Sequence, residues 1–305
     1  MLEDRIVYLN REFVAWDMAT VHQLSHSFSR GSSIFEVISL YETDMGPAIF
    51  RLDRHLDRFY RSAELLGMRV PITREEFHRA VIETVKRNRV DQGIIKVIGY
   101  YPQVVLDVVP PQKDIDISIF AVDPLQDFDG LNISLSEGTT ACLSKWRKLD
   151  PQTVPVEAKA AANYLNGMIA RIDAAERGFE YAVMLDKNGF IAEGGTESIF
   201  LVKENRLMTP SLGSVLRGIS RMSILEAAEA IGLEIFEGQL HPEILREVDE
   251  AFLSSSPSKI QPIRQFEDRT LEPIPGPVSQ QLMDLMEKIL SARDSRFKEW
   301  LFMVE

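Results

Sequence analysis

The spacing of apolar residues divides the first third of the chain into strands and helices. Apolar runs lie on either side of Asn10-Arg11, which is typical of a hairpin with a two-residue turn. Further runs that alternate or are continuously apolar predict strands at residues 33–41, 48–50, 94–98 and 115–122.

Two helices are predicted between these strands. Leu52, Leu56, Phe59, Ala63 and Leu66 recur at helical spacing, and Gly67 is the expected end of this helix. The next helix begins at the capping box Thr73-Arg74-Glu75-Glu76 and is expected to bury Phe77, Val81 and Val85.

The rest of the chain has the same mixed character. A helix is predicted from about residue 160 to residue 177, ending at Gly178, with an inner stripe of Leu165, Met168, Ile169 and Ile172. The remaining spacing predicts strands at 131–135, 181–185, 190–192, 198–202, 206–208 and 251–253, and helices at 219–231 and 278–292.

The order of these elements decides the fold class. Strands and helices do not alternate regularly, so the sequence predicts an α+β fold rather than a doubly wound sheet. Residues 124–130 are polar and rich in turn formers. We therefore expect a small α/β domain over 1–123, a linker over 124–130 and a larger domain over 131–305.

Composition narrows the class of protein. A content of 45% hydrophobic and 26% charged residues indicates a globular chain with a sizeable core. The net charge of −12 argues against nucleic-acid or anionic-membrane binding, and no apolar run is long enough to span a membrane. The start is acidic and unlike a signal peptide, and the single Cys142 fits a reducing cytoplasm. The five histidines show no metal-ligand spacing, so no metal site is expected.

Lys159 is the most informative candidate for chemistry. It lies in a run of small residues, Glu157-Ala158-Lys159-Ala160-Ala161-Ala162-Asn163-Tyr164, which leaves room for a flat molecule beside it. A lysine in a partly apolar pocket has a lowered pKa and can form a Schiff base as a neutral amine. Taken alone, however, a lysine near a helix start is most often a solvated surface residue.

A second pattern suits an anion. Gly218-Ile219-Ser220 precedes a predicted helix, whose first N–H groups and dipole attract negative charge. The serine-rich turn Ser254–Ser256 offers further donors, and Arg58 lies at the edge of an apolar helix stripe, from which it can reach a phosphate. An ordinary serine N-cap and a surface arginine are the alternatives.

Glu193 and Tyr164 complete the candidate set. A carboxylate at Glu193, in a glycine-containing turn, suits the nitrogen of a pyridine ring, and Tyr164 follows Lys159 by five residues. A solvated loop acid and a core tyrosine are the alternatives.

Taken together, these motifs resemble the class IV aminotransferase family of fold-type IV pyridoxal phosphate (PLP) enzymes, most closely its branched-chain group. The resemblance covers nearly the whole chain. Its matching motifs are Ser144 to Pro151, Lys159 to Leu165, Ala192-Glu193-Gly194, Thr209-Pro210, Leu216 to Arg221, His55-Leu56-Asp57-Arg58 and Ser62-Ala63.

The resemblance implies the fold and the roles of these residues. The fold is that of two α/β domains with the active site between them, in a homodimer or larger homo-oligomer. Lys159 is implied to be the Schiff-base lysine and proton shuttle, Glu193 to pair with the pyridine nitrogen, Tyr164 with the ring oxygen, and Leu216 to pack on the ring. The implied phosphate ligands are Arg58, Ile219, Ser220 and Ser256, and the implied substrate contacts are Arg30, Phe35, Lys96 and Ser255.

The substrate end departs from the branched-chain pattern. Lys96 replaces an arginine, Arg30 replaces an aromatic residue, and Pro257 removes a backbone N–H from the turn that holds the substrate carboxylate in that group. The leading hypothesis is a transaminase that acts on an amino acid and a 2-oxo acid. An aminodeoxychorismate-lyase-type enzyme, a D-amino acid aminotransferase and a PLP-binding relative without catalysis are the alternatives.

Overall fold

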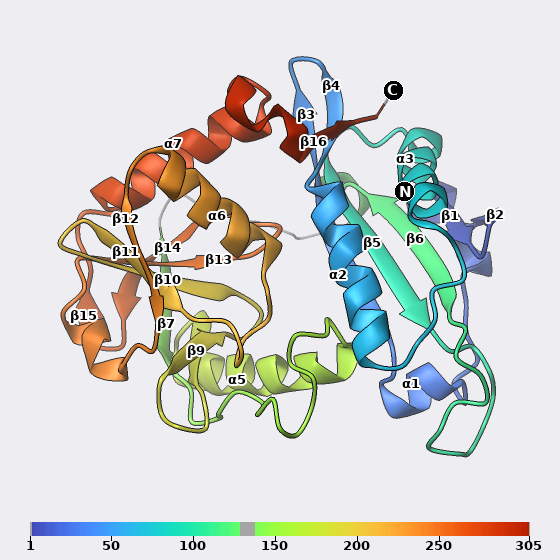
Figure 1. Ribbon diagram of the computed structural model, residues 1–305, viewed down its shortest axis with the longest axis horizontal. Helices are drawn as coiled ribbons and strands as arrows, with labels where there is room; N and C mark the ends of the chain where they lie inside the picture. Colours follow the sequence, from blue (N-terminus) through green and yellow to red (C-terminus); the bar gives the residue numbers. More distant parts are fainter. Residues whose placement is uncertain (1, 129–137, 305) are drawn as a thin grey trace. The chain divides into compact units, whose positions relative to one another are not determined.

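The computed structural model describes residues 2–128 and 138–304, and its contacts group the chain into two compact units (Figure 1). Unit 1 combines residues 1–132 with the separate segments 158–162 and 288–305, and unit 2 combines 133–157 with 163–287. This grouping differs from the boundaries expected at 123 and 131, because the segment 158–162 and the last part of the chain pair with strands of unit 1.

Unit 1 is built on a seven-stranded antiparallel sheet. Its strands are β1 (Ile6–Leu9), β2 (Glu12–Ala15), β3 (Ile34–Thr43), β4 (Gly46–Phe50), β5 (Gly93–Tyr100), β6 (Asp116–Val122) and β16 (Leu301–Met303). Their order is β16-β4-β3-β5-β6-β1-β2, and every neighbouring pair is antiparallel. Asn10 and Arg11 join β1 to β2 with positive φ angles, which confirms the predicted hairpin.

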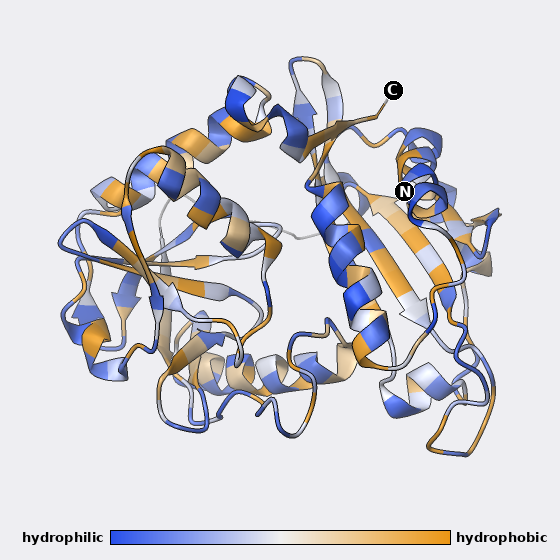
Figure 2. Cartoon of the chain, viewed as in Figure 1, coloured by the Kyte–Doolittle hydropathy of each residue, from blue (hydrophilic) through white to orange (hydrophobic). Residues whose placement is uncertain are grey.

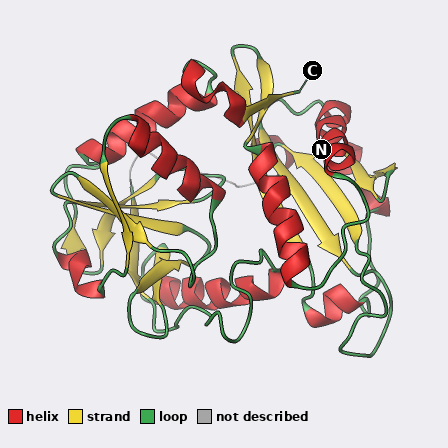
Figure 3. Cartoon of the chain, in the orientation of Figure 1, coloured by secondary structure: helices red, strands yellow, loops and turns green. Residues whose placement is uncertain are grey.

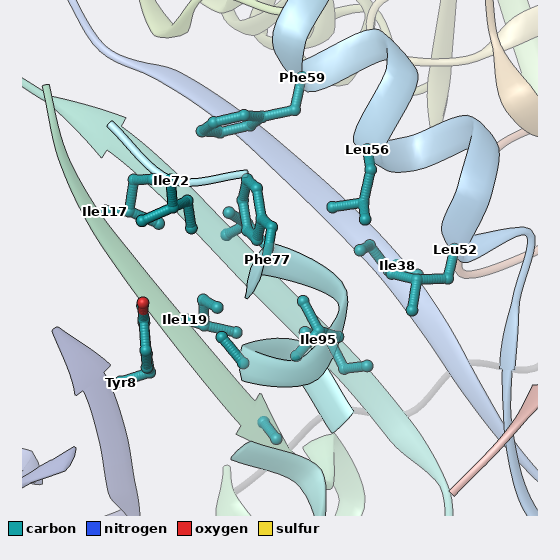
Figure 4. Close-up of a cluster of buried hydrophobic side chains, with 14 of the residues drawn as sticks. Tyr8, Ile38, Leu52, Leu56, Phe59, Ile72, Phe77, Ile95, Ile117 and Ile119 are labelled. Carbon is teal, nitrogen blue, oxygen red and sulfur yellow. The ribbon is translucent and has the colours of Figure 1, made fainter. Parts of the chain in front are cut away.

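Two long helices, α2 (Leu52–Leu65) and α3 (Arg74–Asn88), pack their apolar sides on one face of this sheet. Figure 4 shows Leu56 and Phe59 of α2 pointing toward the strands that carry Ile38 and Ile95. Gly67 follows α2 with φ of 67°, and the capping box at Thr73 is present as predicted. The short helices are η1 (Leu2–Asp4), η2 (Trp16–Met18), α1 (His26–Arg30), α4 (Pro124–Asp127) and η5 (Ser295–Trp300).

Unit 2 contains a nine-stranded mixed sheet. Its strands are β7 (Thr139–Leu143), β8 (Tyr181–Leu185), β9 (Ile191–Gly194), β10 (Ser198–Lys203), β11 (Arg206–Pro210), β12 (Glu234–Gly238), β13 (Glu250–Ser254), β14 (Gln261–Phe266) and β15 (Arg269–Thr270). The order is β12-β11-β10-β13-β14-β7-β8-β9, with β15 paired to β14. The pairs β11–β12, β14–β7 and β7–β8 are parallel, which gives the mixed α+β class predicted from the sequence.

The helices of unit 2 are α5 (Tyr164–Glu176), α6 (Ile219–Ala230), most of α7 (Pro277–Leu290) and the short η4 (Pro242–Arg246). The short η3 (Ala161–Asn163) leads into α5, which packs on β7 and β8, while α6 packs on β12. Figure 3 separates these helices from the strands, and Figure 2 shows apolar and polar residues mixed along α5. Among the described residues, no helix combines the length and apolar character needed to cross a membrane.

The predicted inner stripe of α5 is wrong. Leu165, Met168 and Ile172 are 59%, 52% and 49% exposed, whereas the buried positions are Gly167, Ala170, Asp173 and Ala174. The helix approaches the sheet through these smaller residues, since a Cβ on Gly167 would lie 1.9 Å from the Gly195 carbonyl oxygen. Close backbone packing, rather than apolar side chains, therefore decides which face of α5 is buried.

Several elements differ from the sequence prediction in other ways. The apolar spacing did not predict β7, β12, β14, β15 or β16. Within the predicted linker, Pro124–Asp127 forms α4, whereas residues 129–130 and the predicted strand at 131–135 lie outside the described residues.

Replacement of Gly167 by alanine tests the packing of α5. Alanine normally stabilises a helix interior by about 1 kcal/mol relative to glycine. Here the clash with Gly195 is expected to reverse the sign and to destabilise the protein by about 2 kcal/mol, as measured by urea unfolding. Ala175→Gly, at an exposed position of the same helix, measures the ordinary difference between the two residues. A Gly167→Ala variant that is more stable than the parent contradicts the close packing.

Candidate active site

Lys159 is held in place through its backbone. Its N–H donates to Ser62 Oγ of α2 at 2.9 Å, and its carbonyl accepts a hydrogen bond from Phe35 N of β3 at 3.0 Å. Ala160 forms a bridge with Ile34, so the segment 158–162 continues the pairing of β3. The side chain is only 8% exposed, which places an amine in a largely apolar environment.

Two amines share the ring of Phe35. Lys159 Nζ lies 4.7 Å from the ring centroid and Lys96 Nζ lies 3.9 Å from it. Both distances are within the range of cation–π attraction. Burial lowers the pKa of Lys96, while the carboxylate of Glu36 opposes that shift. Unit 1 thus brings together Lys159, Phe35 and Lys96, three of the predicted site residues.

Arg58 takes part in a buried ionic network. Its Nε and Nη2 donate to the two carboxylate oxygens of Glu36 at 2.7 and 2.6 Å, and His55 Nδ1 lies 2.7 Å from Oε2 of the same carboxylate. Burial opposes ionisation of Glu36, but Arg58 and His55 outweigh it and lower its pKa to about 2. Glu36 takes two of the five guanidinium N–H groups and fixes the plane of the others.

Arg30 is the last predicted site residue of unit 1. It ends α1, where its Nη2 donates to the carbonyl of Leu106 at 2.9 Å. The segment around Leu106 carries further exposed apolar residues, including Val108 and Val109. Arg30 therefore lies beside an apolar loop, not beside the phosphate candidate Arg58.

In unit 2, the N-terminus of α6 and the end of β13 meet. Gly218 is the N-cap of α6, and no side chain caps the helix. A Cβ on Gly218 would lie 2.9 Å from Ser198 Oγ, and Ser198 is paired with Ser254 across β10 and β13. The Ser254 hydroxyl is buried and has no hydrogen-bond partner among the described residues. An uncapped helix start beside such a hydroxyl suits an anion, and the buried Ile219 and Ser220 form its first turn.

The turn after β13 is closed by a buried lysine. Lys259 Nζ donates to the Ser256 carbonyl at 2.6 Å, and Ser255 Oγ lies 2.8 Å from Ser258 Oγ. Burial lowers the pKa of Lys259 to about 7. Ser255 and Ser256 are thus presented on a turn that a nearby amine stabilises from within.

Glu193 lies on β9 and is buried. One carboxylate oxygen accepts from Leu216 N at 3.3 Å, and the other forms an ion pair with Lys148. This contact brings the predicted residues Glu193 and Leu216 together just before the start of α6. Tyr164 is half-buried at the first position of α5.

Sequence reasoning missed several residues of these clusters. Glu36 carried a usable signal, because its position in β3 falls in the same phase as the core residues Ile34 and Ile38. A carboxylate on the buried face of a strand requires a polar or charged partner that is buried with it. Lys148 carried no comparable signal, because its contact with Glu193 joins segments far apart in the sequence. Lys259 contacts the carbonyl of Ser256, only three residues away, but no motif marked this turn lysine. Among the described residues, no group of histidine, cysteine, aspartate or glutamate side chains is arranged to hold a metal ion.

The amino-acid sequence is similar to those of known proteins. Residues 33–266 match the family described as Amino-transferase class IV. The chain is 33% identical over 262 residues to the branched-chain-amino-acid aminotransferase of Escherichia coli K12, covering 86% of this chain and 84% of that protein.

The fold is also similar to solved structures of branched-chain aminotransferases. The branched-chain aminotransferase of the archaeon Thermoproteus uzoniensis, solved with norvaline, superimposes with a TM-score of 0.93 at 31% identity over 99% of both chains. The branched-chain amino acid aminotransferase of Thermobaculum terrenum in its PLP form has a TM-score of 0.91 at 28% identity over 100% of both chains.

The network around Arg58 predicts a pH-dependent loss of stability. The folded-state pKa of Glu36, about 2, lies below its ordinary value of 4.5. Its contribution is therefore fully present above pH 4.5 and is lost as the pH falls toward 2. Glu36→Gln is expected to cost about 3 kcal/mol of unfolding free energy at pH 7, and this difference should shrink as the pH falls to 3.

Urea unfolding between pH 7 and pH 3 measures this difference. Glu42→Gln, on an exposed position of the same strand, is the matched control and should change little at any pH. A difference for Glu36→Gln that stays constant over the whole range rules out an ionised Glu36 as its source.

Proposed function

The chain belongs to the class IV aminotransferases, and from this premise we propose how its residues bind the cofactor and which substrates it takes. It is a PLP-dependent transaminase of fold type IV that moves an amino group between an amino acid and a 2-oxo acid. The observation that best supports our assignment of the reacting amine is the buried Lys159, fixed through both its N–H and its carbonyl.

We assign the phosphate of PLP to groups that suit an anion. The backbone N–H groups of Ile219 and Ser220 lie at the uncapped start of α6, where Gly218 leaves no room for a side chain. The hydroxyl of Ser254, which has no hydrogen-bond partner in the described part of the chain, supports an anion at the same place. Ser256 and Arg58 provide the remaining contacts, and Glu36 fixes the guanidinium plane of Arg58.

The ring of PLP is assigned to three other residues. Glu193, whose charge is balanced by Lys148, interacts with the pyridine nitrogen. Tyr164 would donate a hydrogen bond to the ring oxygen, and Leu216 would contact the ring. Bound PLP supplies an electron sink for the charge that develops when the substrate α-proton leaves.

Lys159 carries the proton in this scheme. When PLP is bound, the Nζ of Lys159 would hold it covalently, and once released as a neutral amine it would take the α-proton of the amino substrate. The same nitrogen would return that proton to the cofactor side, and water would complete the release of the oxo acid. A second oxo acid would accept the amino group by the reverse proton transfers, with release of water.

The substrate is proposed to be an amino acid related to the branched-chain group, with weak activity on leucine, isoleucine and valine. Pro257, in the turn after β13, has no N–H to offer a substrate carboxylate. Lys96, which lies over Phe35, and Arg30, which lies beside the apolar loop around Leu106, are assigned to that carboxylate. Phe35 and Ser255 are assigned to the same subsite.

We further propose a homodimer or larger homo-oligomer in the cytoplasm. The exposed apolar residues Leu165, Met168 and Ile172 on α5 support an association between copies of the chain. The single cysteine supports a reducing compartment.

Lys159→Ala tests the assignment of the reacting amine. The variant is expected to lose transamination while it still binds PLP noncovalently, because the phosphate and ring contacts remain. In the parent protein, borohydride reduction followed by peptide mapping should place the cofactor on Lys159. A label on another lysine, or an active Lys159→Ala variant, contradicts the assignment.

Pro257→Ala and Arg30→Ala test the substrate proposal. Pro257→Ala restores an N–H to the turn, and a hydrogen bond to a charged group is worth about 1.5–3 kcal/mol. We therefore expect kcat/KM for leucine to rise about tenfold or more, and Arg30→Ala to raise KM for amino donors with little change in PLP affinity.

Steady-state kinetics with a panel of L- and D-amino acids measures both effects. Strong turnover of leucine by the parent protein, or donor constants unaffected by either variant, contradicts the proposal. Pyruvate release without dependence on an oxo acid identifies a lyase, and turnover of D-amino acids alone identifies a D-amino acid aminotransferase.

A further inference from the structure

Two lysines lie over one aromatic ring within unit 1. Lys96 Nζ is 3.9 Å and Lys159 Nζ is 4.7 Å from the centroid of Phe35, so the two nitrogens are no more than about 9 Å apart. Only one of these amines forms the covalent link in the proposed function. The other is a half-buried cation, assigned above to the substrate carboxylate, which also lies close enough to act on the first amine.

The pairing of β3 with β5 explains why Lys96 reaches this ring. Phe35 is opposite Ile98 and Val37 is opposite Lys96, so these four side chains share one face of the sheet. Phe120 of β6 is opposite Lys96 on its other side. The immediate neighbours of Lys96 on both adjacent strands are therefore apolar, which weakens the screening of its charge.

The nearby carboxylate does not cancel this charge. Glu36 lies between Phe35 and Val37 in β3 and therefore points to the opposite face of the sheet. Both of its oxygens accept from Arg58 of α2, and His55 of the same helix adds a third contact. The other nearby cation, Arg30 of α1, is exposed and donates to Leu106. Lys96 and Lys159 thus lie beside the ring of Phe35, whereas the Glu36–Arg58 pair lies on the opposite face of the sheet.

We propose that Lys96 is a positioning residue whose positive charge keeps the Nζ of Lys159 in its neutral form. This role rests on the assignment of Lys159 as the reacting amine. A neighbouring cation disfavours a second positive charge, and this is one of the ways in which a lysine becomes a nucleophile and base near neutral pH. Both amines lie close to the ring of Phe35, which limits how far apart they are and so sets the scale of the repulsion.

The size of the effect follows from the separation. Two unit charges no more than about 9 Å apart, at an effective dielectric constant of about 20, shift a pKa by on the order of one unit or more. At a fixed pH below the midpoint, removal of the charge should therefore lower the neutral fraction of Lys159 about tenfold.

The test uses the full chain loaded with pyridoxamine 5'-phosphate. This form of the cofactor cannot link to lysine, so the site stays filled while Nζ of Lys159 is accessible to chemistry. Initial rates of reductive methylation of Lys159 are measured by peptide mass spectrometry between pH 6 and pH 10, in the parent, Lys96→Met and Lys96→Arg. The exposed Lys113 in the same samples is the internal reference for reagent and pH.

Lys96→Met is expected to move the methylation midpoint of Lys159 upward by about one pH unit, whereas Lys96→Arg, which keeps the charge, should leave it near that of the parent. An unchanged midpoint in Lys96→Met overturns the proposal. Equal shifts in Lys96→Met and Lys96→Arg also overturn it, because they indicate an effect of shape rather than charge. Borohydride mapping of the PLP-loaded parent separately decides whether Lys159 is the linking lysine, so the two assignments fail independently.

Discussion

The backbone of Lys159 is held by two hydrogen bonds, and most of the chemistry assigned to this protein depends on them. Ser62 holds its N–H, and Phe35 donates to its carbonyl. A flexible four-carbon side chain becomes useful for proton transfer only when its attachment point does not move. Because one contact comes from α2 and the other from β3, the position of this lysine follows from the packing of that helix on that strand.

The buried charges of both units are arranged in a similar way. Three buried ionisable side chains near the candidate site have a specific polar or charged neighbour: Glu36 has Arg58, Glu193 has Lys148, and Lys259 has the Ser256 carbonyl. Burial of such a pair costs desolvation free energy, and the pair adds little to the net free energy of unfolding. Their benefit lies in orientation, since a guanidinium or carboxylate with one side occupied can present only its other side to a ligand.

The sequence predicted best those features that depend on neighbouring residues. The hairpin at Asn10-Arg11, the end of α2 at Gly67 and the capping box at Thr73 all depend on local backbone preferences and were confirmed. The buried face of α5 was wrong because helical spacing identifies an apolar stripe but not whether it faces the sheet. Gly167 and Ala174 allow a closer approach than Leu165 or Met168, and this becomes visible only when Gly195 is placed against the helix.

For the candidate site, the motifs predicted candidate residues but not the partners that hold them. Lys159, Glu193 and Ser220 were identified through their order along the chain, which the resemblance to a family made specific. The contacts from Ser62, Glu36 and Lys148 join residues far apart in sequence, and no local pattern encodes such a meeting.

The way unit 1 is assembled from separate stretches has a consequence for synthesis on the ribosome. Its edge strand β16 pairs with β4 across most of the length of the chain, and the segment 158–162 pairs with β3. The first 128 residues contain the other six strands of this sheet, yet they leave β4 with an unpaired edge until residues 301–303 have been translated. An unpaired edge is a template for pairing with other chains. Completion of this sheet therefore depends on residues translated long after its other strands, and an open edge at β4 favours pairing with other chains until then.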